Sequence, residues 1–179
     1  MEVLMGYAVR GAVLLGILTL DLCRAQAFNE YQVKAAFLYT FAKFVEWPPQ
    51  AFSSPSAAIT ICVMGDDPFG NFLDDAVSGK TVGDRRLAVY RIADLRAGSE
   101  CKILFIAASE RRRMSALLAS VSMPGLLTVG DTPEFPAQGG VIGLRTDGER
   151  IRLSVNLTAA EKAKMRISSR VLSLATIVK

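Results

Sequence analysis

Histidine is absent from this chain of 179 residues, and its absence limits the available chemistry. Without an imidazole, the protein cannot form a histidine-dependent catalytic triad, a histidine metal ligand or an imidazole proton shuttle. Two adjacent carboxylates, Asp66 and Asp67, follow an apolar run, and paired acids in such a place could hold Mg²⁺ or accept a phosphoryl group. The sequence Gly65-Asp66-Asp67-Pro68 also fits a helix start with Asp67 as N-cap, and we favour that structural interpretation.

A second motif, Gly79-Lys80-Thr81, is similar to the end of a phosphate-binding loop. However, Asp74 stands where such a loop would begin with glycine, and the tripeptide follows a predicted helix instead of opening one. We therefore interpret it as a helix terminus and loop. No spacing supports a serine–lysine or carboxylate hydrolase, so we predict a protein without catalytic residues, metal or cofactor.

Two further features could serve either structure or binding. Arg111, Arg112 and Arg113 begin a predicted helix from about Ser109 to Val121, where cations oppose the helix dipole at a cost of about a few tenths of a kcal/mol each. An acidic partner or an anionic ligand would offset this cost, although exposure to water and screening by salt would also suffice. Trp47, the only tryptophan, is either a core anchor or an interface hot spot.

The first 27 residues have the pattern of a secretory signal peptide. The uncharged run Gly11–Leu20 lies between Arg10 and the cleavage motif Ala25-Gln26-Ala27. This run is about half of the roughly 20 residues that a membrane-spanning helix needs, which disfavours an uncleaved anchor. The residues before Cys23 are not the small ones of a lipidation site. We predict cleavage after Ala27 and a periplasmic protein.

Residues 28–179 are predicted to form a single domain. Lysine and arginine number 21 against 17 acidic residues, and the formal charge of +4 belongs to this part because the leader's acids and bases cancel. A modest positive charge fits an anionic partner or membrane surface, or simply a soluble basic protein. Nucleic acid is not available as a partner in the periplasm.

Cleavage would remove Cys23 and leave two cysteines, Cys62 and Cys101, in an oxidising compartment, where we expect them to pair. Each lies in a predicted buried strand, Ile59–Met64 or Cys101–Ala107, and adjacent strands would bring the two Cα atoms within bonding range. Two free buried thiols are the alternative. A catalytic redox role is disfavoured because no Cys-x-x-Cys spacing exists.

The elements that would position these residues alternate between helices and strands. A long helix is predicted over Asn29–Trp47, with a narrow polar stripe and an apolar remainder, and Pro48-Pro49 would end it. Asp147-Gly148 predicts a hairpin turn. The other predicted elements are a helix after Asp67 that ends near Gly79, strands at 86–92, 126–129, 141–145 and 150–155, and helices at 158–165 and 168–178. This order predicts an α/β three-layer sandwich with a mostly parallel sheet, extended by a C-terminal antiparallel hairpin.

Three segments resemble the YfiR family of periplasmic proteins: residues 30–48 (EYQVKAAFLYTFAKFVEWP), 61–69 (ICVMGDDPF) and 156–175 (NLTAAEKAKMRISSRVLSLA). The resemblance implies a non-enzymatic repressor that binds the periplasmic part of an inner-membrane diguanylate cyclase and holds it inactive, lowering cyclic di-GMP and biofilm formation. Cys62 and Cys101 match a disulfide of the family. A second cysteine pair that some relatives carry is missing near residues 139–144.

We therefore predict a regulator that works by contact with an inner-membrane sensor protein, a diguanylate cyclase or a sensor kinase. The candidate contact residues are Phe44 and Trp47 of the first helix and the arginines 111–113, with the C-terminal helix as a further surface. Two alternatives stay open. The apolar face of the first helix could serve a homodimer, or the protein could bind a small molecule in a crevice near Gly65 and Ala107.

Overall fold

A computed structural model describes residues 29–95, 100–121 and 123–178. The predicted signal peptide lies outside the described residues. Among those residues, no helix has the length and apolar character needed to cross a bilayer. The helices are α1 (Glu30–Phe44), α2 (Phe72–Val77), α3 (Met114–Ser120), α4 (Leu157–Lys162) and α5 (Ser169–Leu172), with 3₁₀ turns η1 (Pro49–Ala51) and η2 (Ala108–Arg113).

The strands form one large sheet and one small ribbon. They are β1 (Val45–Glu46), β2 (Ile59–Met64), β3 (Thr81–Val82), β4 (Arg85–Ile92), β5 (Ile103–Ile106), β6 (Leu127–Gly130), β7 (Ile142–Asp147), β8 (Arg150–Asn156), β9 (Arg166–Ile167) and β10 (Ala175–Val178). The eight-stranded sheet has the order β10-β8-β7-β6-β5-β2-β4-β3, and β1 pairs with β9.

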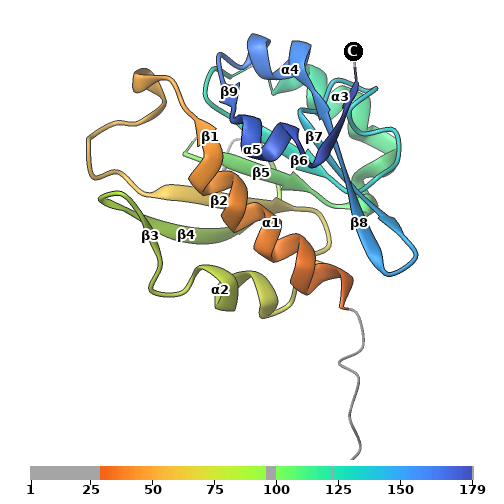
Figure 1. The fold of residues 1–179 in the computed structure, drawn as a ribbon, viewed down its shortest axis with the longest axis horizontal. Helices are drawn as coiled ribbons and strands as arrows, with labels where there is room; N and C mark the ends of the chain where they lie inside the picture. The colour runs from red at the N-terminus through yellow and green to blue at the C-terminus, as the bar shows by residue number, and fades with distance from the viewer. Residues whose placement is uncertain (1–28, 96–99, 122, 179) are drawn as a thin grey trace, which may run out of the picture.

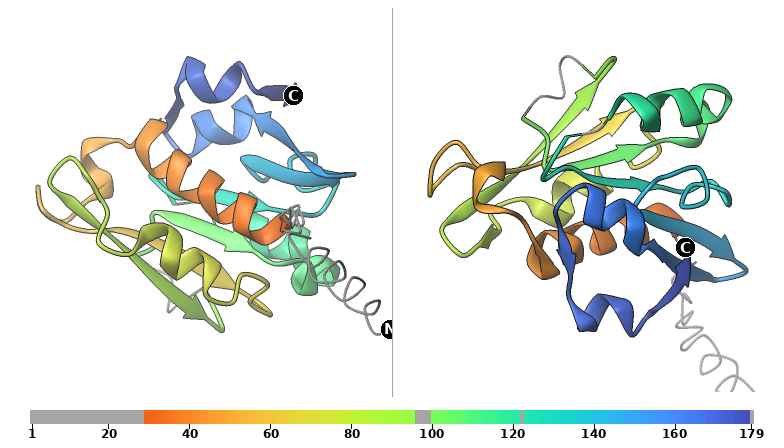
Figure 2. Two further views of the ribbon diagram at one scale, coloured as in Figure 1. Left: turned by 60° about the horizontal axis from the view of Figure 1, so that its bottom comes forward. Right: turned by 90° about the horizontal axis from the view of Figure 1, so that it is seen from above.

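The fold is the predicted α/β sandwich with a mostly parallel sheet (Figures 1 and 2). Strands β4, β2, β5, β6 and β7 are parallel neighbours, and β7 and β8 form the predicted antiparallel hairpin. Asp147 pairs with Arg150, so the hairpin loop is Gly148-Glu149, and Gly148 has the positive φ of +59° that such a tight turn requires.

Two apolar layers sandwich the central strands because successive side chains alternate between the faces of a strand. In β2, Ile61 and Val63 face the layer that contains α1, α2, α4 and α5, whereas Cys62 and Met64 face the layer that contains α3. Buried positions therefore run without interruption along β2 and β5, as expected for parallel strands covered on both sides.

The first helix begins as predicted but ends earlier. The Asn29 side chain accepts a hydrogen bond from the backbone N–H of Gln32 at 3.2 Å and caps the helix start. The helix ends at Phe44, before Pro48, because the next two residues pair with β9. The prediction that Trp47 ends the helix is therefore wrong.

The predicted helix after Asp67 also starts later than expected. Its N-cap is Asn71, and the residues after Asp67 form turns. The helix predicted from Ser109 is divided into the 3₁₀ turn η2 and the short helix α3. In both places the chain first has to turn back over the end of a strand, which delays regular α-helix by several residues.

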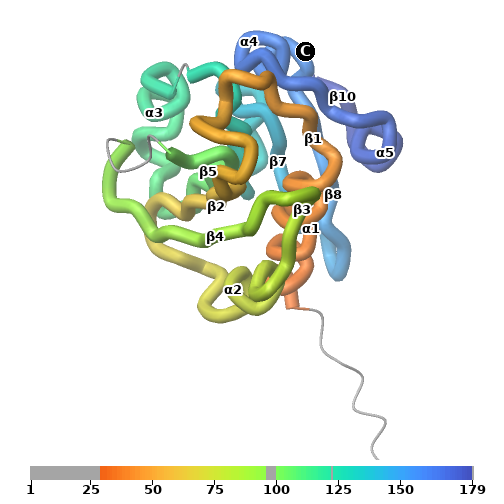
Figure 3. The backbone as a smooth tube through the Cα atoms, turned by 90° about the vertical axis from the view of Figure 1, so that its left-hand side faces the viewer, coloured from red at the N-terminus to blue at the C-terminus, as the bar shows by residue number. Residues whose placement is uncertain are grey.

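The last predicted helix, residues 168–178, is wrong in its second half. Only the single turn α5 is helical, and β10 follows it as an edge strand parallel to β8, with Ala175 opposite Leu153. The edge of β8 offers unpaired backbone groups, which favours a strand for the β-branched residues Thr176, Ile177 and Val178. Figure 3 shows α5 projecting beyond α1 at one side of the molecule.

Candidate functional site

The two cysteines form a disulfide, in agreement with the sequence prediction. Cys62 lies in β2 and Cys101 lies two residues before β5, and their Cα atoms are 5.8 Å apart. Both residues are buried, in the layer that contains α3. The bond therefore links a central strand to the start of its parallel neighbour and closes a loop with a sequence separation of 39.

The paired acids after β2 have structural contacts. The Asp67 carboxylate accepts a hydrogen bond from the backbone N–H of Phe69 at 2.8 Å and another from Arg91 Nε at 2.8 Å. Arg91 also donates two bonds to Asp74 on α2, of 2.9 and 2.5 Å. Asp67 thus shapes the turn before α2 and helps Arg91 hold α2 against β4, although it is not the N-cap that the sequence suggested. Among the residues the structure describes, no group of three or more acidic or cysteine side chains could hold a metal ion.

The hydrogen bonds between Arg91 and Asp74 also change the pKa of Asp74. Hydrogen bonds from Arg91 are the main cause that lowers the pKa of Asp74, against a smaller opposing effect of burial. Asp74 is therefore held in its ionised form by a structural partner.

The Gly79-Lys80-Thr81 tripeptide lies after the end of α2, as the sequence predicted, and Gly79 has a φ of +67°.

The three arginines lie at the end of η2, and Arg113 is the N-cap residue of α3. Arg113 forms an ion pair with Glu110, and Arg111 lies 3.3 Å from Glu134. The protein's own acids thus offset two of the three charges. Arg112 is exposed and forms no ion pair within the described part of the chain.

Phe44 and Trp47 lie on the other side of the sheet, at the end of α1. Both are half-buried and pack against the α1-side core. The Trp47 ring meets Phe52 edge-on at 6.2 Å between centroids, which fits the core-anchor interpretation, while its buried Nε1 donor has no hydrogen-bond partner in the described structure. The structure therefore separates the predicted contact residues: Phe44 and Trp47 are on one face, and arginines 111–113 precede the helix that covers the opposite face.

The crevice expected near Gly65 and Ala107 is occupied by the protein itself. Gly65 follows β2 with a φ of +89°, and a Cβ added there would lie 2.5 Å from Ser109 Oγ. The same hydroxyl accepts a hydrogen bond from the backbone N–H of Asp66 at 2.9 Å. The 3₁₀ turn η2 thus packs directly onto the end of β2.

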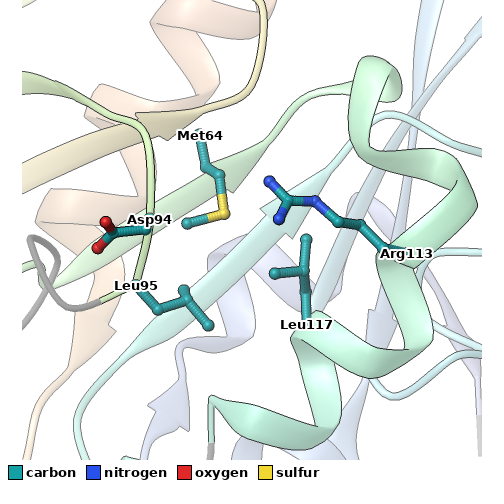
Figure 4. A pocket seen from close by; sticks show the side chains of 5 residues that line it. All are labelled: Met64, Asp94, Leu95, Arg113 and Leu117. Atoms are coloured by element: carbon teal, nitrogen blue, oxygen red, sulfur yellow. The ribbon is translucent and has the colours of Figure 1, made fainter.

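A shallow cavity of about 370 Å³ lies beside this closed crevice, on the side of α3. Its lining residues are Met64, Asp94, Leu95, Arg113 and Leu117. Figure 4 shows Arg113 and Leu117 extending from one side toward Met64 and Leu95. The lining combines three apolar side chains with one carboxylate, Asp94, and one cation, Arg113, which also forms an ion pair with Glu110.

Sequence reasoning missed a buried charged cluster at the start of α1. Lys34 is only 1% exposed, and its Nζ forms ion pairs with Glu30 and with Asp131, which follows β6. The Tyr31 hydroxyl donates a hydrogen bond of 2.9 Å to the same Asp131 oxygen. Burial and the neighbouring Asp131 carboxylate raise the pKa of Tyr31. The only signal in the sequence was the four-residue spacing of Glu30 and Lys34, which predicts an ion pair between them but does not indicate Asp131 or the burial of Lys34.

The chain matches one protein family and is similar in fold to two solved structures. The family model described as YfiR/HmsC-like matches residues 31–176. A solved structure titled as a conserved domain protein from Vibrio cholerae O1 biovar El Tor is similar, with a TM-score of 0.56 and 14% identity, over 81% of this chain and 60% of that one. Another, titled as an ABC domain in complex with L-Trp from Streptococcus pneumoniae, has a TM-score of 0.52 and 9% identity, over 84% and 61%.

These two likenesses concern the fold alone. The chain spans about three fifths of the length of each of the two solved structures. No curated protein matches the sequence.

Proposed function

The chain belongs to the YfiR/HmsC-like family, and from this premise we propose that it is a non-enzymatic regulator outside the inner membrane. It binds the periplasmic part of an inner-membrane signalling protein, most simply a diguanylate cyclase, and restrains it. A sensor kinase is the alternative partner. The leader at residues 1–27, its cleavage and a single domain from residue 28 to 179 are parts of this proposal.

The observation that carries the proposal is the extent of the family match. Residues 31–176 run from the first turn of α1 into β10, so the match includes every layer of the sandwich. The residues that could have supported other chemistry have structural contacts: Asp67 holds a turn and Arg91, and Ser109 closes the end of β2. Of the candidate residues that the sequence indicated, Phe44, Trp47 and the arginines 111–113 are left, and we infer that they act by surface contact.

Regulation by contact requires a difference in affinity between two forms of the partner. If this protein binds the inactive form of the receptor's outer domain more tightly, the population shifts toward that form by the ratio of the two affinities. Equal affinity for both forms would regulate nothing. The rigid, disulfide-closed sandwich suits this role because a preformed surface loses little conformational freedom on binding.

The two predicted contact regions lie on opposite faces, so they make separate hypotheses. The first is Phe44 with Trp47 at the end of α1, and the second is the arginine turn 111–113. Arg112 is the most available of the three arginines, because Arg111 and Arg113 each face an acid of the same chain.

Co-expression tests the function directly. The full chain would be produced with a membrane diguanylate cyclase that has a periplasmic domain, and cyclic di-GMP would be measured together with recovery of the cyclase on the tagged regulator. We expect lower cyclic di-GMP with the wild type and no change with a leaderless version that stays in the cytoplasm. Unchanged cyclic di-GMP together with no recovered membrane receptor would overturn the proposal.

Variants on the two faces then locate the contact. Phe44→Ala with Trp47→Ala removes one candidate surface, and Arg112→Glu alters the other without breaking an ion pair. The double variant needs a melting curve as control, because both rings pack against the core. Loss of repression by a folded variant on one face, with the other face's variant still active, assigns the interface.

The cavity beside β2 supports a second candidate, a periplasmic small-molecule binding protein. Its volume of about 370 Å³ and its lining, which joins apolar side chains to the opposite charges of Asp94 and Arg113, suit a small ligand that carries both charges. L-tryptophan is a reasonable first probe, because the similar fold from Streptococcus pneumoniae is described in complex with it. A melting shift that Leu117→Trp abolishes would favour this candidate. Light scattering on the same samples would report any homodimer.

A further inference from the structure

A row of alternating cations and aromatic rings crosses the surface of α1, and four contacts join its five members. Lys80 Nζ lies 4.5 Å from the centroid of Tyr39, and Lys43 Nζ lies 5.5 Å from the rings of both Tyr39 and Phe44. The Arg170 guanidinium lies 5.3 Å from the Phe44 ring. We call Lys80, Tyr39, Lys43, Phe44 and Arg170 the cationic–aromatic row.

The row brings together three separate parts of the chain. Lys80 precedes β3, Tyr39 to Phe44 belong to the last turns of α1, and Arg170 belongs to α5. Figure 1 shows these parts side by side across the front of the molecule, and Figure 3 shows α5 projecting on the same side. The three cations are exposed, and both rings are half-buried.

None of the three cations forms an ion pair with the acids that the structure describes. The nearest acid along the chain, Glu46 in β1, lies 3.7 Å from Arg166 and is thus directed to another cation. The row is therefore a local excess of positive charge with aromatic rings between the charges. Its occupant should be anionic.

The spacing of the charges indicates what kind of anion. A site for one carboxylate or phosphate brings two or more donors to a single point. Here each cation lies over a ring, and the contacts follow one another along a line. Separate cations in a line match a surface that repeats its anions, such as a layer of phospholipid headgroups, where aromatic side chains also favour the interfacial zone.

The segment from α5 into β10 adds exposed apolar side chains beside the row. Leu174, four residues after Arg170, is 67% exposed, and Ile177 in β10 is 42% exposed. Apolar side chains next to cations are the composition of proteins that lie on a membrane surface. We propose that the cationic–aromatic row docks this protein on an anionic phospholipid surface, independently of any receptor.

Vesicle sedimentation tests the proposal. The exported protein, as the cell processes it, would be mixed with vesicles of phosphatidylglycerol and phosphatidylcholine, or of phosphatidylcholine alone. We expect binding to the anionic vesicles that falls with added salt, and no binding to the neutral ones. Binding to neutral vesicles at the same strength would overturn the proposal, because a retained apolar leader would produce it.

Matched variants separate the row from net charge. Lys43→Gln with Lys80→Gln and Arg170→Gln removes three cations of the row, and Arg145→Gln with Arg150→Gln and Lys162→Gln removes three exposed cations elsewhere. At about fivefold for each cation near an anionic surface, we expect the row variant to bind about 100-fold more weakly and the control variant to bind like the wild type.

Equal losses in the two variants would show that only net charge matters and would overturn the proposal. Binding to polyglutamate with no binding to anionic vesicles would also overturn it, in favour of an acidic protein as partner. Melting curves check that both variants are folded, and the three single substitutions, each expected to lose about fivefold, replace the row variant if it is not.

Discussion

Lys34 Nζ lies 3.3 Å from Asp131 Oδ2, and this contact joins the first helix to the end of β6 across 97 residues. The side chains are 1% and 3% exposed. The second Asp131 oxygen is buried and without a hydrogen-bond partner in the described structure. The stability of this carboxylate therefore depends on Lys34 and on the Tyr31 hydroxyl.

Removal of Lys34 is expected to be costly. Lys34→Met leaves Asp131 buried without its cation, and breaking such a pair costs about 3–5 kcal/mol. Lys34→Met combined with Asp131→Asn removes the charge from both partners and keeps a hydrogen-bond acceptor for Tyr31, so we expect it to recover part of the loss. Urea unfolding of the three proteins measures both changes. A double variant less stable than Lys34→Met would contradict this explanation.

The disulfide is expected to stabilise the fold by about 4 kcal/mol, because it closes a loop of about 40 residues in the unfolded chain. Cys62→Ala with Cys101→Ala should lower the free energy of unfolding by that amount in oxidising buffer. Cys23→Ser is the control, since the predicted cleavage removes it. The entropic explanation fails if the double variant loses less than about 1 kcal/mol.

The pKa of Asp74 is expected to lie below its ordinary value of 3.8, because Arg91 stabilises the carboxylate. A lowered pKa in the folded state means that this contribution to stability is complete above pH 3.8 and is lost as the pH falls through the lower folded value. NMR titration of the carboxyl carbon gives the pKa directly. Arg91→Gln should return it toward 3.8, and an unchanged low pKa in that variant would rule out Arg91 as the cause.

Gly65 and Gly83 form a matched pair for testing close packing after β2. Both have a positive φ, of +89° and +57°, but a Cβ at Gly83 meets nothing within 4 Å, whereas at Gly65 it would strike Ser109. Gly83→Ala should cost about 1 kcal/mol through backbone strain alone, and Gly65→Ala about 3 kcal/mol because overpacking is added. Denaturation curves compare the two. Similar losses would mean that Ser109 moves aside freely.

Patterns that are local in sequence could be predicted well. The start of the first helix near Asn29, the Asp147-Gly148 turn and the buried strand around Cys62 each depend on neighbours within a few residues. The order of strands and helices then limited the fold to a parallel α/β sandwich, because parallel neighbours need crossover helices. The disulfide followed from the small number of cysteines and the predicted compartment.

Features that depend on distant partners could not be predicted. Leu174, Ala175 and Val178 have a spacing that suits a helix, and only the free edge of β8 makes residues 175–178 a strand. The early end of α1 likewise depends on β9, more than a hundred residues away. Lys34 can be buried because it pairs with Asp131 at the end of β6, and no residue near Lys34 in the sequence indicates that partner.

The short ribbon of β1 and β9 has a consequence for the order of assembly. Val45 pairs with Ile167, so the strand that pairs with the residues after α1 is synthesised more than a hundred residues later. The amino-terminal half therefore cannot complete its contacts until β9 has been synthesised. In the export that we propose, this delay would keep the chain from completing its fold before it crosses the membrane.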